Sequence, residues 1–301
     1  MPAGTCTGRV AVITGAGTGI GRAHALAFAA QGARVVVNDL GGARDGGGSS
    51  AGPAQAVADE ITAAGGEAVA STDDISSWAG AERLIGQAVE AFGGLDVVVN
   101  NAGILRDRMI VSMTEADWDA VIGVHLKGTF AVLHHAAAYW RRRVKDGHAN
   151  DARVINTTSP SGLFGNPGQG NYGAAKAGIA SLTIVAAREL ERYGVTVNAI
   201  APTALTRMTE DIEMMRTAAA AADLSPEAIS PLVVWLGSPE SRDVTGRLFG
   251  VWGNAITVLE GWVNGPAVSR DTRWDSPGLS AVIPALVAKA APNADTLGSR
   301  P

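Results

Sequence analysis

The chain has 301 residues, of which 47% are apolar and 18% are charged, and its formal net charge is −5. This apolar content can build a large core and excludes an intrinsically disordered protein, while the acidic balance argues against general nucleic-acid binding and a basic membrane-surface protein. With the single cysteine Cys6, the chain forms no internal disulfide and no cysteine-based zinc site, so we predict no metal centre.

Short apolar runs alternate with longer segments rich in helix formers along most of the chain. No run of about 18 uncharged apolar residues interrupts this pattern, so we expect no membrane partner and a cytoplasmic location. The predicted strands cover residues 10–13, 34–39, 67–71, 95–99, 153–158 and 195–200, with a seventh near 251. The predicted helices cover residues 22–30, 53–64, 81–92, 117–143 and 172–192.

Strands that are apolar on both faces are typical of a parallel sheet covered by helices on both sides. The expected fold is therefore α/β: a Rossmann-type doubly wound parallel sheet of about seven strands, in a single domain over residues 1–301. Its core is expected at about 8–254, followed by a C-terminal extension at 255–301 that covers a neighbouring subunit or the site, with Trp262 and Trp274 as anchors.

A glycine-rich turn joins the first predicted strand to the first predicted helix. Its glycines allow a tight turn and let the backbone approach a phosphate, and the helix N-terminus offers N–H groups to a pyrophosphate. The predicted dinucleotide-binding residues of this turn are Gly15, Gly17, Thr18, Gly19, Ile20 and Gly21.

Asp39 lies 18 residues beyond Gly21, at the end of the second predicted strand. Its carboxylate can accept hydrogen bonds from both ribose hydroxyls of NAD and would repel the 2′-phosphate of NADP. Arg22 and Arg34 are the nearby cations that could favour NADP, but neither takes the obvious place beside Asp39. The sequence therefore predicts NAD as the cofactor.

Two further segments near this part of the chain have open interpretations. Asp74 and Ile75 follow the third predicted strand and either contact the adenine or form a strand-end turn. The glycine-rich stretch at 41–53 is either a solvated insertion or a flap over the adenosine side of the cofactor.

Tyr172 and Lys176 are four residues apart at the start of a predicted helix, which places them on one face. A nearby ammonium favours the phenolate and lowers the pKa of a tyrosine. Ser159, at the end of a predicted strand, can donate to a substrate carbonyl oxygen while Tyr172 supplies the proton, and Ser161 is a rival for that role.

These residues, in this order, resemble the short-chain dehydrogenase/reductase family. The resemblance rests on Thr14-Gly15-x-x-x-Gly19-x-Gly21, Asn100-Asn101-Ala102-Gly103, Ser159 and Tyr172-x-x-x-Lys176, and it covers about residues 8–250. Several segments look more closely like the (3R)-hydroxyacyl-CoA dehydrogenase module of peroxisomal multifunctional enzyme type 2, also known as a 17β-hydroxysteroid dehydrogenase. They are residues 38–42, 100–108, 124–128, 165–169 and 231–236.

The resemblance assigns roles to individual residues. It implies that Tyr172 is the general acid/base, that Ser159 polarises the carbonyl, and that Lys176 binds the nicotinamide ribose. His125 stands where the family usually has a catalytic Asn, and acts through its main-chain carbonyl or packs beneath the site. The further cofactor contacts that it implies are Asn101, Ala102, Gly103, Pro202, Thr203 and Thr206.

The expected function is that of an NAD-dependent oxidoreductase that interconverts a secondary alcohol and a ketone, with a (3R)-hydroxyacyl-CoA as the preferred substrate. A hydroxysteroid or another apolar alcohol, a 3-oxoacyl reductase activity, and a non-catalytic NAD-binding module are the alternatives. The methionine-rich segment at 203–230 favours an apolar substrate. The long apolar helices and the family resemblance both imply a homodimer or homotetramer.

Overall fold

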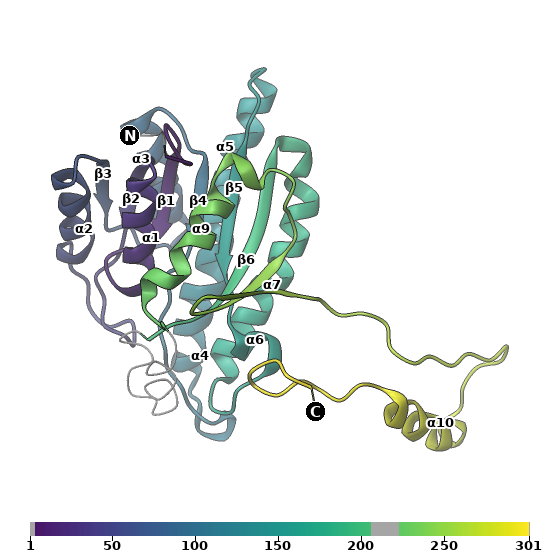
Figure 1. Cartoon of the computed structure of the whole chain (residues 1–301). Helices are drawn as coiled ribbons and strands as arrows, with labels where there is room; N and C mark the ends of the chain where they lie inside the picture. The colour runs from purple at the N-terminus through teal and green to yellow at the C-terminus, as the bar shows by residue number, and fades with distance from the viewer. Residues whose placement is uncertain (1–3, 206–222, 301) are drawn as a thin grey trace.

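The computed structural model describes residues 4–205 and 223–300 as one α/β domain around a central sheet (Figure 1). The strand order is β3-β2-β1-β4-β5-β6-β7-β8. The first seven strands run parallel to their neighbours, and β8 pairs antiparallel with β7. The strands are β1 Val10–Thr14, β2 Arg34–Asn38, β3 Glu67–Ser71, β4 Val97–Asn100, β5 Ala152–Thr157, β6 Val195–Thr203, β7 Leu248–Trp252 and β8 Ala255–Leu259.

Helices cover both faces of the sheet, which confirms the predicted doubly wound architecture. Alternate strand residues point to opposite faces, so Ala11 and Ile13 join one apolar core while Val10 and Val12 join the other. The helices over the first core are α1 Gly19–Ala30, α2 Gly52–Ala63 and α9 Ser230–Gly237, and those over the second are α3 Trp78–Phe92, α5 Gly128–Lys145 and α7 Gly170–Leu190. In the described residues, no helix combines the length and hydropathy needed to cross a membrane.

The segment predicted as one helix over 117–143 is interrupted. The structure has α4 at Glu115–Ile122, a π-helical turn at Gly123–Lys127, and then α5. A π-helical turn shifts the helical register by one residue and is frequent near functional sites. Here it buries His125, which a continuous amphipathic pattern did not reveal.

Strand β8 is an addition to the predicted seven strands. Gly253, with a φ of +53°, and Asn254 form a two-residue connection between β7 and β8, since Trp252 pairs with Ala255. A Gly-Asn pair between two apolar runs is a hairpin signal, so the sequence did contain this information.

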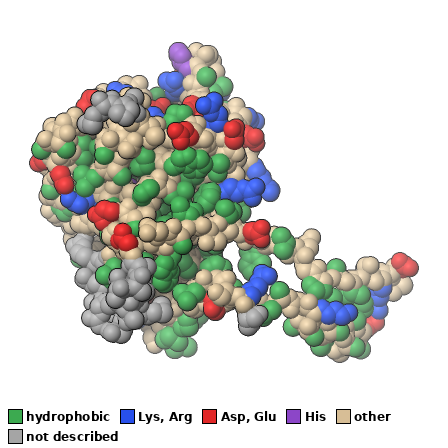
Figure 2. Space-filling view, viewed as in Figure 1, with side chains coloured by type: hydrophobic (Ala, Val, Ile, Leu, Met, Phe, Trp, Pro, Cys, Tyr) green, Lys and Arg blue, Asp and Glu red, His purple; other side chains and the backbone are tan. Residues whose placement is uncertain are grey.

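The remaining C-terminal chain projects from the body as an arm that carries α10, Ser276–Lys289 (Figures 1 and 2). No residue of α10 is buried, and Trp262 is 99% exposed, so Trp262 is not an anchor within this chain. Trp274 stacks on the guanidinium of Arg270 at 4.3 Å. The chain then returns to α6, Pro160–Phe164, where a Cβ on Gly298 would lie 2.8 Å from the Phe164 ring.

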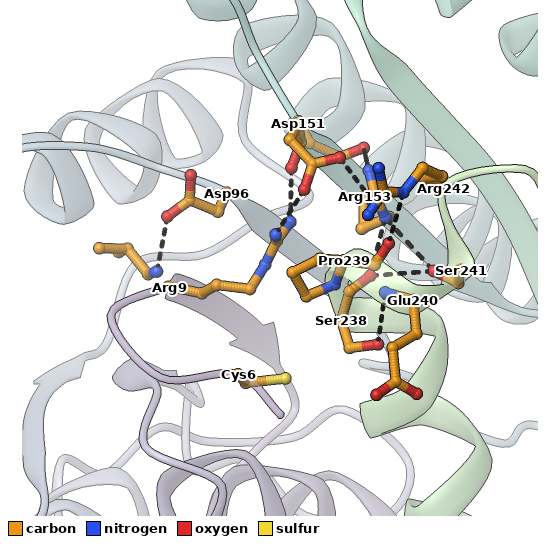
Figure 3. Close-up of polar contacts among 12 residues, drawn as sticks. Cys6, Arg9, Asp96, Asp151, Arg153, Ser238, Pro239, Glu240, Ser241 and Arg242 are labelled. Atoms are coloured by element: carbon orange, nitrogen blue, oxygen red, sulfur yellow. Dashed lines mark hydrogen bonds and ion pairs between the residues drawn. The ribbon is translucent and has the colours of Figure 1, made fainter. Parts of the chain in front are cut away.

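A charged cluster fixes the amino ends of the strands, opposite the candidate site (Figure 3). Asp151 accepts from Arg9 Nη1 at 2.9 Å and from Arg153 Nη2 at 2.5 Å. The buried Arg153 guanidinium also donates to the Ser238 carbonyl and the Ser241 hydroxyl. The buried Arg153 guanidinium therefore has several acceptors, as burial of a charge requires.

Candidate active site

The candidate site lies where the carboxyl ends of β1, β4, β5 and β6 meet, at the point where the strand order reverses. There the Thr14 hydroxyl accepts the N–H groups of Asn101 at 3.0 Å and Ala102 at 3.1 Å. The Asn101 side chain donates to the carbonyls of Thr14 and Gly15. These contacts hold the Asn101–Gly103 segment against the glycine turn, a role for Thr14 that sequence reasoning did not identify.

The glycine turn has the close backbone packing that dinucleotide binding needs. A Cβ on Gly21 would lie 2.1 Å from the Gly15 carbonyl oxygen, and one on Gly15 would lie 2.7 Å from Cα of Ala102. Gly15 and Gly19 adopt φ angles of +65° and +54°, which favour glycine. Thr18 and Ile20 lie on the same turn, at the start of α1. The predicted residues therefore form one compact turn at a helix N-terminus.

Asp39 lies directly beside this turn. Its Oδ2 accepts the N–H of Gly17 at 2.8 Å, and its Oδ1 accepts the N–H of Gly41 at 2.7 Å. Both arginines that could have favoured NADP are held elsewhere: Arg22 pairs with Glu60 at 2.7 Å, and Arg34 donates to the Phe92 carbonyl at 2.9 Å. The carboxylate therefore faces the turn with neither arginine to offset its charge.

The other predicted cofactor residues occupy three kinds of position. Asp74 accepts from the Ser76 N–H and hydroxyl, so its carboxylate holds the turn into α3, while Ile75 is buried against Gly128. Pro202 and Thr203 end β6, half-buried and paired with β7. Thr206 lies outside the described residues, as do Met208, Met214 and Met215 of the predicted apolar segment.

Ser159, Tyr172 and Lys176 come together as predicted. Ser159 precedes α6, and its side chain lies close enough to Tyr172 to lower the pKa of that tyrosine. Ser161 donates its backbone N–H to Ser159 Oγ, and of the two candidate serines Ser159 is the one that lowers the pKa of Tyr172. The Lys176 ammonium lies 5.5 Å from the Tyr172 ring centre and donates to the Thr157 carbonyl at 2.6 Å.

Burial is the largest influence on the pKa values of Tyr172 and Lys176. Burial raises the pKa of Tyr172 above its usual value, and the Ser159 hydrogen bond opposes that change. Burial also lowers the pKa of Lys176 to about 7. The expected depression of the Tyr172 pKa by Lys176 is therefore not seen: desolvation of the phenolate is the largest influence and raises this pKa.

Asn171 is a further residue of the site that sequence reasoning missed. Its side chain is fully buried and donates to the carbonyls of Arg106 and Asp117, at 3.1 and 3.0 Å. Its amide oxygen accepts the N–H of Tyr172 at 2.7 Å. Asn171 thereby attaches the start of α7 to the loop that follows β4, and no periodicity in the sequence predicts this.

The His125 side chain contacts the same loop. Its Nε2 lies 3.0 Å from the nitrogen and 2.8 Å from the oxygen of Ile104, so it bonds to the Ile104 backbone in either neutral tautomer. Its ring meets the Tyr172 ring edge-on, with centroids 5.2 Å apart. Burial lowers the pKa of His125 to about 3, which keeps the imidazole neutral near physiological pH.

We predict that His125→Asn retains most of the activity, because Asn can also bond to the Ile104 backbone. Neither protein should show a step near pH 6.5, the reference pKa of histidine, in its kcat profile. Below pH 6.5 this histidine is protonated in the unfolded chain but stays neutral in the folded chain, where its pKa is about 3. The free energy of unfolding of wild type therefore decreases as the pH falls toward 3. At pH 5 this loss amounts to about 2 kcal/mol for one such histidine.

Urea unfolding at pH 7 and pH 5 should therefore show a smaller acid-induced loss in His125→Asn than in wild type. A rate that falls a hundredfold at unchanged stability, together with loss of a titration near pH 6.5, would instead identify the imidazole as a proton carrier.

Comparison with known proteins identifies a family for the chain. The family model for short chain dehydrogenases matches residues 9–217. A crystal structure of a short chain dehydrogenase from Mycobacterium avium is 58% identical, with a TM-score of 0.88, and the match covers 97% of this chain and 99% of that one.

Two relatives have more specific names. The hydroxyacyl-CoA dehydrogenase ChsB1 of Mycobacterium tuberculosis is 46% identical over 92% of this chain and 88% of its own length. The peroxisomal multifunctional enzyme type 2 of Drosophila melanogaster is 48% identical over 78% of this chain, and the match spans 38% of that longer protein.

Proposed function

The chain belongs to the short chain dehydrogenase family, and on that premise we propose that it is an NAD-dependent dehydrogenase that interconverts a (3R)-hydroxyacyl-CoA and its ketone. The observation that carries the proposal is the Ser159, Tyr172 and Lys176 cluster at the switch point of the sheet, beside the glycine turn and Asp39. This set of acid/base groups also argues against a module that binds NAD without catalysis.

Each residue of the cluster has a distinct task. Tyr172 takes the hydroxyl proton when the alcohol is oxidised and returns it when the ketone is reduced. Ser159 acts on the pKa of Tyr172 and orients the substrate oxygen. Lys176 holds the nicotinamide ribose, and Asn101 to Gly103 line the cofactor. The nicotinamide, when bound, accepts or supplies the hydride.

The surface near the site supports an apolar substrate. Met109, Ile110 and Val111 are 60%, 81% and 94% exposed, on a loop that bonds to the start of α7 through Arg108 N–H and the Gly168 carbonyl at 2.8 Å. The relative named hydroxyacyl-CoA dehydrogenase ChsB1 favours an acyl-CoA. A hydroxysteroid or another bulky apolar alcohol is the second candidate, since the same apolar rim suits it.

A substrate panel tests the proposal. (3R)- and (3S)-hydroxyacyl-CoA, a hydroxysteroid and a small secondary alcohol are each offered with NAD, and NADH formation is read by absorbance. We expect the (3R)-acyl-CoA to give the highest kcat/KM. Faster turnover of the steroid would favour the second candidate, and absence of NADH with every alcohol would contradict the proposal.

A homodimer or homotetramer is the assembly that we propose. Large apolar side chains on α4, α5 and α7 are 36–46% exposed, and they are Trp118, Phe130, Val144, Ile184 and Val185. A groove between α5 and α7 is lined by Arg141, Arg188 and Glu189, among others. We predict that light scattering at micromolar concentration gives a multiple of 30.6 kDa, and that Val185→Asp shifts it toward the monomer. A wild-type monomer would contradict this prediction.

A cytoplasmic location remains a prediction for this chain. The Drosophila melanogaster relative is peroxisomal by name, so the two compartments are the alternatives. Cell fractionation with an antibody against the chain decides between them.

A further inference from the structure

The glycine-rich loop at residues 41–51 starts at the acidic end of the candidate site. Ser50 N–H donates to the Leu40 carbonyl at 2.9 Å, which closes the base of the loop. Gly41 has a φ of +71°, and a Cβ there would lie 1.9 Å from the Ser50 carbonyl oxygen. The Gly41 N–H donates to Asp39 Oδ1, while Gly17 occupies Oδ2. The base of the loop is thus attached to the carboxylate that we expect to hold the ribose.

The tip of the same loop contacts the segment that follows β4. Leu105 N–H donates to the Arg44 carbonyl at 3.0 Å, and Arg106 Nε donates to the Asp45 carbonyl at 2.7 Å. Gly46, with a φ of +87°, lies so close to Ile104 that a Cβ would be 3.0 Å from Cδ1 of that side chain. The stretch expected to be either a solvated insertion or a flap is therefore a bridge with two attached ends.

Arg106 continues this bridge toward the acid/base group. Its Nη1 donates to the Ala116 carbonyl at 3.3 Å, and its own carbonyl accepts from the Asn171 side chain at 3.1 Å. Asn171 in turn accepts the Tyr172 N–H at 2.7 Å. Hydrogen bonds and covalent segments thus connect Asp39, the loop, Arg106, Asn171 and Tyr172 in that order.

We propose that Arg106 is a positioning residue that couples binding of the adenosine end of NAD at Asp39 to the placement of Tyr172. The inference rests on the proposed function, because it takes Asp39 as the ribose-binding group. A ligand that orders the base of the loop also orders its tip, and the tip holds Arg106 through the Asp45 carbonyl. Couplings between two sites are typically about 5- to 150-fold in affinity.

Hydrogen exchange measured by mass spectrometry, with and without NAD, tests the coupling without relying on turnover. In wild type we expect NAD to slow amide exchange both at residues 41–51 and at 104–108. In Arg106→Ala we expect protection to persist at 41–51 but to weaken at 104–108, where only the Leu105 N–H bond to the Arg44 carbonyl still joins the segment to the loop. The matched control is Arg108→Ala, which should behave as wild type. Arg108 is exposed, and within residues 4–205 and 223–300 its side chain forms a hydrogen bond only with the neighbouring Asp107 carbonyl.

A second variant shortens the bridge itself. Replacing residues 43–48 by two glycines removes both carbonyl acceptors at the tip and keeps Asp39. We expect Arg106→Ala and the shortened loop each to lower kcat about tenfold at an unchanged melting temperature. The reason is that a misplacement of a catalytic group by about 1 Å can lower the rate by up to about a hundredfold. Combining the two changes should lower kcat no further, since both changes break the same connection between the loop and Arg106.

The outcomes separate this inference from the proposed function. Protection confined to 41–51 in wild type, or a loss of kcat that merely tracks a loss of melting temperature, would overturn the role of Arg106 and leave the proposed function standing. No NAD-dependent protection at 41–51 in wild type would overturn the assignment of Asp39, and this proposal with it.

Discussion

Replacing Tyr172 by phenylalanine is expected to lower kcat by about 10²- to 10⁴-fold, the usual contribution of a general acid/base. The change removes one hydroxyl and keeps the ring that meets His125 edge-on. Affinity for NAD, measured by fluorescence titration, should stay within a few-fold of wild type. Because burial raises the pKa of Tyr172, alcohol oxidation by wild type should also rise with pH above neutrality, as the phenolate becomes populated.

Tyr193→Phe is the matched control for this experiment. Tyr193 ends a 3₁₀ turn after α7 and stacks on Arg192, 21 residues along the chain from Tyr172, so its loss should leave kcat unchanged. More than about a tenth of wild-type turnover in Tyr172→Phe would show that another group transfers the proton. Loss of NAD binding would instead assign Tyr172 a structural role.

NAD should bind more tightly than NADP, by well over tenfold. The 2′-phosphate of NADP would approach the Asp39 carboxylate, and two like charges about 4 Å apart repel by roughly 4 kcal/mol at an effective dielectric constant near 20. Arg22 and Arg34, the two cations that the sequence analysis weighed against Asp39, are bonded to Glu60 and to the Phe92 carbonyl. Calorimetric titration of both cofactors measures the difference directly.

Asp39→Asn removes the charge while it keeps the size of the side chain and one of its two acceptor oxygens. We expect this change to narrow the gap between NAD and NADP, while Asp39→Ala also releases the Gly17 and Gly41 N–H groups. Asp45→Asn is the control, since the Asp45 carboxylate bonds to Gly47 within the loop. Equal or tighter binding of NADP by wild type would refute the NAD assignment.

The linear sequence determined the fold class and the core of the candidate site. Short β-branched runs such as Val35–Val37 are buried on both faces only in a covered parallel sheet, so local composition sufficed. The glycine turn, Asp39 and the Tyr172–Lys176 spacing are also local patterns, because each depends on residues a few positions apart or on one strand-helix-strand unit.

The tertiary structure decided what depends on contacts between distant segments. Asn171 meets Arg106 and Asp117 across 65 and 54 residues, and Arg106 meets Asp45 across 61. Such hydrogen bonds leave no periodic pattern, since a polar residue in a loop has the same composition whether it faces solvent or another loop. The π-helical turn that buries His125 and the two attachments of the 41–51 loop therefore emerged only from the folded chain.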